Sequence, residues 1–176
     1  MGILGPDHPF PSDRFSDVLA ANVAYADGFQ ATDLPGRAAR GLAVVTCIDS
    51  RIDALAVTGM QEGDAFVLRN AGARVTDDVL RSLVLATSLM AANRILVMPH
   101  TRCAMAQHDE VEIHRRIAER HGTDTRSLEF RTVADQVEAL RTDVTRIRAL
   151  PYLRDGVTVA GAIYHVESGL LEPVDA

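Results

Sequence analysis

The sequence predicts an α/β fold, with a central, mostly parallel sheet of four strands plus an antiparallel C-terminal edge strand, helices on both faces, and an N-terminal helical arm. Three observations support this fold class. Short apolar runs without polar alternation recur along the chain, which is typical of strands buried on both faces. Segments with helical spacing separate these runs, as in parallel α/β sheets. The last two apolar runs flank a tight turn, which indicates an antiparallel strand pair.

The expected elements follow from apolar spacing and from the turn residues beside each segment. The first helix is expected to take Ser16 as its N-cap and to end at Gly28. The later elements are a strand at 42–47, a short helix at 51–60, a strand at 64–70, a helix at 77–92 capped by Thr76, a strand at 94–100, helices at 109–122 and 134–150, and a strand pair within 156–174. We expect one domain over residues 1–176, with an arm at 1–36 and an α/β core at 37–176.

Composition and charge restrict the possible partners. The formal net charge of −6 argues against nucleic acid or an anionic membrane, because both attract basic surfaces. The sequence contains no apolar stretch of the roughly 20 residues that a membrane span requires. The first residues lack a basic leader followed by an apolar run, so a cytoplasmic protein is expected. In that compartment the two cysteines are expected to be thiols or metal ligands.

Polar and ligating side chains follow two of the expected strands. Cys47, Asp49 and Arg51 stand at alternate positions where the strand at 42–47 ends, and His100 and Cys103 follow a later strand. Because the carboxyl ends of parallel strands meet at one edge of a sheet, we expect these residues to lie close together. A catalytic zinc takes three protein ligands and keeps one position open. The two cysteines and the histidine form such a set.

The residues alone leave several interpretations open. A cysteine at the end of a buried strand often serves only as a small apolar side chain. Asp49, held by Arg51, is able either to accept a hydrogen bond from a water on the metal or to occupy the fourth position and close the site. From the residues alone, an ordinary turn is the favoured interpretation of residues 70–72.

Three linked motifs carry a resemblance to a known family. Cys-x-Asp-x-Arg, Arg-Asn-Ala-Gly and His-x-x-Cys occur in this order between residues 42 and 105. In order and separation they resemble the core of the β-class carbonic anhydrases, most closely the short bacterial members. The resemblance implies that Cys47, His100 and Cys103 bind Zn²⁺.

The resemblance also implies an activity and further site residues. Asp49 and Arg51 would form a catalytic dyad beside the zinc. The loop that lines the substrate pocket would contain Asn70, Ala71 and Gly72. The implied reaction is reversible hydration of carbon dioxide to bicarbonate and a proton by zinc-bound hydroxide, in a homodimer or a higher homo-oligomer.

Two positions depart from the usual family pattern. Arg102 stands where the family usually has Asp, and Ala104 stands where it usually has Gly. Neither change removes a ligand, but both alter the surroundings of the site. The alternative functions are therefore a hydrolase of carbon disulfide or carbonyl sulfide with the same fold, a non-catalytic zinc protein with a closed site, and a redox protein that uses Cys47 and Cys103.

Overall fold

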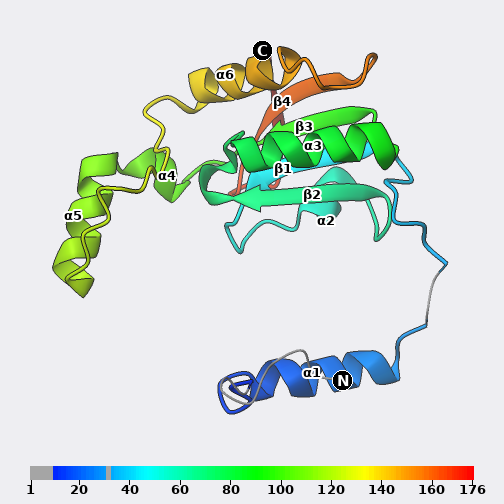
Figure 1. Cartoon of the computed structure of the whole chain (residues 1–176), viewed down its shortest axis with the longest axis horizontal. Helices are drawn as coiled ribbons and strands as arrows, with labels where there is room; N and C mark the ends of the chain where they lie inside the picture. The colour runs from blue at the N-terminus through cyan, green and yellow to red at the C-terminus, as the bar shows by residue number, and fades with distance from the viewer. Residues whose placement is uncertain (1–9, 31–32) are drawn as a thin grey trace. The chain divides into compact units, whose positions relative to one another are not determined.

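The computed structural model describes residues 10–30 and 33–176, which form two compact units divided after Leu34 (Figure 1). The first unit contains the helix α1, Ser16–Asp27, which ends before Gly28 as expected. The predicted serine cap is wrong. Phe15 occupies the N-cap position, and the Ser16 hydroxyl donates to a preceding carbonyl instead of accepting a helix N–H. Residues 1–9 and 31–32 of the predicted arm lie outside the described residues, so the division into arm and core stays a prediction.

The second unit is built on a five-stranded sheet in the order β2-β1-β3-β4-β5. The strands are β1 Leu42–Cys47, β2 Ala65–Asn70, β3 Arg94–Met98, β4 Thr158–Tyr164 and β5 Leu171–Val174. The first four strands are mutually parallel, and β5 runs antiparallel to β4 at the edge. The fold class expected from the sequence is confirmed.

Helices pack against both faces of this sheet. On one face α3 (Asp77–Leu89) and α6 (Gln136–Arg148) bury their apolar side chains against β1, β3 and β4. The opposite face packs against α2 (Ala54–Thr58) and the residues around the strand ends. Successive residues of β1 contribute to opposite faces, which explains why the strand reads as a continuous apolar run.

Two further helices follow β3. They are α4, Ala104–Gln107, and α5, Glu110–His121, and a short 3₁₀ turn at Ala71–Ala73 follows β2. The side chain of Asp109 caps α5, and Gly122 ends it with a φ of 68°. Within the described ranges, every helix is too short or too polar to span a bilayer.

The register of the parallel strands positions the candidate site. Cys47, the last residue of β1, lies opposite Asn70, the last residue of β2. On the other side Thr46 lies opposite Met98, the last residue of β3. The chain after β3 continues along β4, because His100 forms a parallel bridge with Tyr164. The carboxyl ends of the strands therefore meet at one edge, as the sequence predicted.

Gly161 tests the packing of α6 on the sheet. A Cβ added at this position in β4 would lie 2.9 Å from Cγ and Cδ1 of Leu140 in α6. We expect Gly161→Ala to lower the free energy of unfolding by about 1–3 kcal/mol, since a filled core must distort to accept the methyl group. Urea unfolding measures this change.

Gly36→Ala provides the matched control. A Cβ at Gly36 would meet nothing within 4 Å, and the backbone there does not have a positive φ. We expect a change within about 0.5 kcal/mol for this variant. Equal unfolding midpoints for the two variants would contradict tight packing between Gly161 and Leu140.

Candidate metal centre

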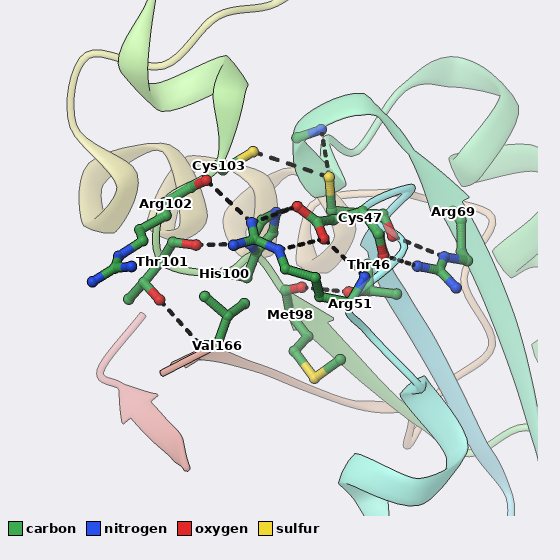
Figure 2. Close-up of polar contacts among 12 residues, drawn as sticks. Thr46, Cys47, Arg51, Arg69, Met98, His100, Thr101, Arg102, Cys103 and Val166 are labelled. Atoms are coloured by element: carbon green, nitrogen blue, oxygen red, sulfur yellow. Dashed lines mark hydrogen bonds and ion pairs between the residues drawn. The ribbon is translucent and has the colours of Figure 1, made fainter. Parts of the chain in front are cut away.

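Three potential ligands converge at the carboxyl edge of the sheet (Figure 2). Cys47, His100 and Cys103 are all buried, and their ligand atoms lie within 4.8 Å of one another. The two Sγ atoms are 4.0 Å apart. Two sulfurs bound to one tetrahedral zinc at about 2.3 Å each are separated by about 3.8 Å. The three side chains are therefore spaced as a zinc ion requires.

The orientation of the His100 ring also suits a metal. Nδ1 lies 2.8 Å from the carbonyl oxygen of Thr101. A carbonyl only accepts hydrogen bonds, so the proton is on Nδ1 and the lone pair is on Nε2. Among the buried side-chain atoms of the described residues, Nε2 has no hydrogen-bond partner. A fully buried nitrogen without a partner is costly, and a metal ion at the thiols would satisfy it.

The two thiols are electrostatically different. The hydrogen bond from the Cys103 thiol lowers the pKa of Cys47 to about 3, and the backbone N–H of Gly72 contributes by donating to the same sulfur at 3.4 Å. The interaction with Cys47 raises the pKa of Cys103, and burial adds to that rise. One thiolate thus forms next to a second thiol that keeps its proton. A bound cation allows both sulfurs to ionise, so this donor set fits Zn²⁺.

Asp49 and Arg51 form the expected pair next to these ligands. Arg51 donates from Nε to Oδ1 of Asp49 at 2.9 Å and from Nη2 to Oδ2 at 2.7 Å. This bidentate hydrogen bond holds the pKa of the Asp49 carboxyl well below its usual range. Oδ2 also lies 3.7 Å from Nε2 of His100, so a carboxylate oxygen faces the point where the ligand atoms converge.

Arg69 is a structural partner of the site that the sequence did not single out. Its guanidinium donates to the backbone carbonyls of Cys47 at 2.8 Å and Asp49 at 2.6 Å (Figure 2). These two bonds hold the chain that leaves β1. The only sequence signal was the place of Arg69 in the Arg-Asn-Ala-Gly motif.

The loop at 70–72 is held by its own hydrogen bonds. The Asn70 side chain accepts from the backbone N–H of Arg74 at 2.8 Å and donates to the carbonyl of the same residue at 2.6 Å. Gly72 has a φ of 80°, and a Cβ there would lie 3.2 Å from Met105. A side chain would thus disturb the N–H that reaches Cys47. The lining of a substrate pocket by Asn70, Ala71 and Gly72 stays a prediction.

Helix α6 contacts both the end of this loop and the segment after β3. Arg74 forms an ion pair with Asp143 at 2.8 Å, in which the side chains are only 18% and 6% exposed. Breaking such a pair leaves an uncompensated buried charge. Gln136, on the same helix, donates to the backbone carbonyl of His100 at 2.7 Å. Sequence spacing gave no sign of either contact, since both join residues far apart in the chain.

Comparison with known proteins places these residues in a family. The family model described as carbonic anhydrase matches residues 42–171. The chain is 36% identical to β-carbonic anhydrase 1 of Mycobacterium tuberculosis over 159 residues, which cover 90% of this chain and 96% of that relative. This chain belongs to the β-carbonic anhydrase family.

Two further relatives show the range within the family. The crystal structure of a carbonic anhydrase from Streptococcus mutans superimposes with a TM-score of 0.85 at 32% identity, covering 96% of this chain and all of that chain. A carbon disulfide hydrolase of Acidithiobacillus thiooxidans is 30% identical over 155 residues, which cover 76% of this chain and 77% of the relative. The β-carbonic anhydrase fold thus carries more than one named activity among the relatives.

The ligand assignment is tested by metal analysis of Cys103→Ser. We expect one zinc ion per chain in the wild type and strong loss in the variant, because a serine hydroxyl replaces a thiolate donor. Elemental analysis after dialysis measures the occupancy. Circular dichroism must show that the variant is folded. Full zinc occupancy in a folded Cys103→Ser protein would contradict the assignment.

Proposed function

We propose that this protein catalyses the reversible, zinc-dependent hydration of carbon dioxide to bicarbonate and a proton. The observation that carries the proposal is the buried set of Cys47, His100 and Cys103 beside the Asp49–Arg51 pair. Membership in the β-carbonic anhydrase family supports it. When bound, zinc supplies Lewis acidity, which lowers the pKa of a coordinated water from 15.7 towards about 7.

Asp49 is the group of this chain that would act on the attacking water. Its Oδ2 faces the ligands, and Arg51 holds the carboxylate in its charged form. A charged carboxylate accepts a hydrogen bond but cannot donate one. Asp49 would therefore accept a hydrogen bond from the attacking water and orient it towards carbon dioxide.

The contacts of Arg51 favour an open site over one closed by Asp49. Both carboxylate oxygens are engaged by the Arg51 guanidinium, and Oδ1 also accepts the backbone N–H of Arg51 at 3.0 Å. Asp49 would have to give up part of this pairing to reach a ligand position on the metal. The arrangement thus supports catalysis rather than a non-catalytic zinc protein.

Stopped-flow measurement of carbon dioxide hydration on the zinc-loaded protein tests the proposal. We expect activity that rises towards alkaline pH, because two thiolate donors reduce the Lewis acidity of the metal. Parallel assays with carbon disulfide and carbonyl sulfide test the related hydrolase activity. Hydration that is absent at every pH up to about 9, with zinc bound, would contradict the proposal.

Asp49→Asn separates catalysis from zinc binding. We expect the variant to keep its zinc and to lose roughly 10²-fold or more in kcat/KM, since an amide lacks the charge and offers an NH₂ to the nucleophile. Asp53→Asn is the matched control. Asp53 caps α2 in the same segment, and asparagine is an equally good N-cap.

The opposite outcome has a distinct meaning. If Asp49 closed the site in solution, Asp49→Asn would weaken the blocking ligand and raise activity near neutral pH. Such an increase would contradict the open arrangement while leaving the family assignment intact. Activity in Asp53→Asn should equal that of the wild type within a factor of about two.

We also propose a homodimer or a multiple of one, in a bacterial cytoplasm. Within the first unit every residue of α1 is exposed, including Val18, Val23 and Tyr25, and a helix of this length is marginal in water by itself. The core unit has its own apolar groove of about 380 Å³, lined in part by Val57 and Leu96. A second copy would bury such surfaces. A reducing compartment would preserve the thiols as metal ligands.

Light scattering at micromolar concentration checks the oligomeric state. We expect a mass of at least two chains for the wild type, and a shift towards monomer for Val23→Asp, which places a charge on the apolar surface of α1. Asp17→Asn, on the same helix, should not change the mass. A monomeric wild type would contradict the proposal.

A further inference from the structure

The segment between the two ligands after β3 has an unusual backbone. Arg102 lies between His100 and Cys103 and has a φ of 53°, in the left-handed region that non-glycine residues rarely adopt. Such a conformation persists only where neighbouring contacts hold it. Its side chain makes one such contact, because Nε lies 2.6 Å from Oε1 of Glu167 in the turn between β4 and β5.

The same carboxylate holds a second residue of the segment. Oε2 of Glu167 accepts a hydrogen bond from the Thr101 hydroxyl at 2.6 Å. The Thr101 hydroxyl in turn accepts from the backbone N–H of Val166 at 3.1 Å (Figure 2). Glu167 thus contacts two consecutive residues with its two oxygens, and both residues lie between metal ligands.

Thr101 and Arg102 contact residues of the metal centre through their backbone carbonyls. The carbonyl of Thr101 accepts from Nδ1 of His100, the contact that orients the imidazole. The carbonyl of Arg102 accepts from Nη2 of Arg51 at 3.4 Å, and the same Nη2 holds Asp49 (Figure 2). A shift of residues 101–102 would therefore change the direction of the ligand ring and the support of the carboxylate together.

We propose that Glu167 is a positioning residue of the metal centre, which fixes residues 101–102 and through them His100 and the Asp49–Arg51 pair. The proposal rests on the metal site named in the proposed function. It also accounts for Arg102, whose charge is opposite to that of the residue usual in the family. Glu167 compensates this charge from the neighbouring turn.

The solvent exposure of the Arg102–Glu167 ion pair indicates how Glu167 would affect zinc binding. The side chains of Arg102 and Glu167 are 66% and 37% exposed, and exposed ion pairs stabilise proteins only slightly. Most of the effect of Glu167 on zinc binding should therefore come from its carboxylate contacting Thr101 and Arg102 at the same time. Loss of a partner outside the ligand set typically weakens metal binding by about 10–100-fold. Because this partner acts through the backbone, we expect the low end of that range.

The experiment compares zinc release to a chelator from the zinc-loaded wild type, Glu167→Gln and Glu167→Ala. We expect release about 3–10-fold faster for the glutamine variant and about 10-fold or more for alanine. The cobalt-substituted proteins should show altered d–d absorption, which reports the geometry of the ligands. The matched control is Glu172→Gln, since Glu172 pairs with His165 in the same hairpin.

A charge-exchange cycle tests the pairing itself. Arg102→Glu places two carboxylates together, and Glu167→Arg places two guanidinium groups together, so each single variant should release zinc faster. The double variant Arg102→Glu/Glu167→Arg restores opposite charges. We expect it to recover only part of the logarithmic loss of Glu167→Arg, because a guanidinium at this position cannot accept the hydrogen bond of the Thr101 hydroxyl.

The outcomes distinguish this inference from the proposed function. A wild type that binds no zinc overturns both. Zinc binding without carbon dioxide hydration overturns the proposed activity but not the role of Glu167, because zinc release and cobalt spectra still test that role. Release rates and spectra of Glu167→Gln equal to those of Glu172→Gln overturn the positioning role. If Glu167 only stabilised the fold, the metal-free Glu167→Gln protein would have a lower unfolding midpoint than the wild type. A lower midpoint together with unchanged cobalt spectra would also overturn the positioning role.

Discussion

The convergence of β1 and β3 at one edge of the sheet is the constraint on which the rest of the site depends. Parallel pairing with Thr46 opposite Met98 brings Cys47 next to the segment that holds His100 and Cys103. The resulting cluster contains two sulfurs 4.0 Å apart and a buried imidazole nitrogen without a partner. Such a cluster is unfavourable unless a cation binds to it. The register of the sheet, which brings these atoms together, therefore also creates a site that favours a metal ion.

Separate elements stabilise this arrangement, some through backbone carbonyls of the segments that carry the candidate ligands and some through side chains of those segments. Arg69 from β2 holds the carbonyls of Cys47 and Asp49, where the chain leaves β1. Gln136 from α6 holds the carbonyl of His100, and Glu167 from the last hairpin holds the residues between the two ligands after β3. Gly72 donates directly to the Cys47 sulfur. The candidate ligands are therefore directed from several sides, which would limit their motion around a bound metal ion.

Much of the fold was predictable because local patterns agree with the final structure. Continuous apolar runs indicated the buried strands, Thr76 was recognised as a cap, and Gly122 as a helix end. The Ser16 cap was wrong for a local reason, since Phe15 takes the N-cap position and the Ser16 hydroxyl donates to the carbonyl of Asp13 in the preceding turn. Element identity follows from short-range periodicity, whereas the choice between competing hydrogen bonds at a helix start depends on the path of the chain before it.

The order of the strands along the chain, the three candidate ligands and the Asp49–Arg51 motif were all recognisable from the sequence, because each depends on residue type and short spacing. The groups that support them are visible only in the folded chain. The Arg74–Asp143 pair joins residues 69 positions apart, and the Arg102–Glu167 pair joins two surface turns. No periodicity records such contacts, because they arise from parallel pairing and helix packing. The orientation of each ligand is therefore a property of the folded chain.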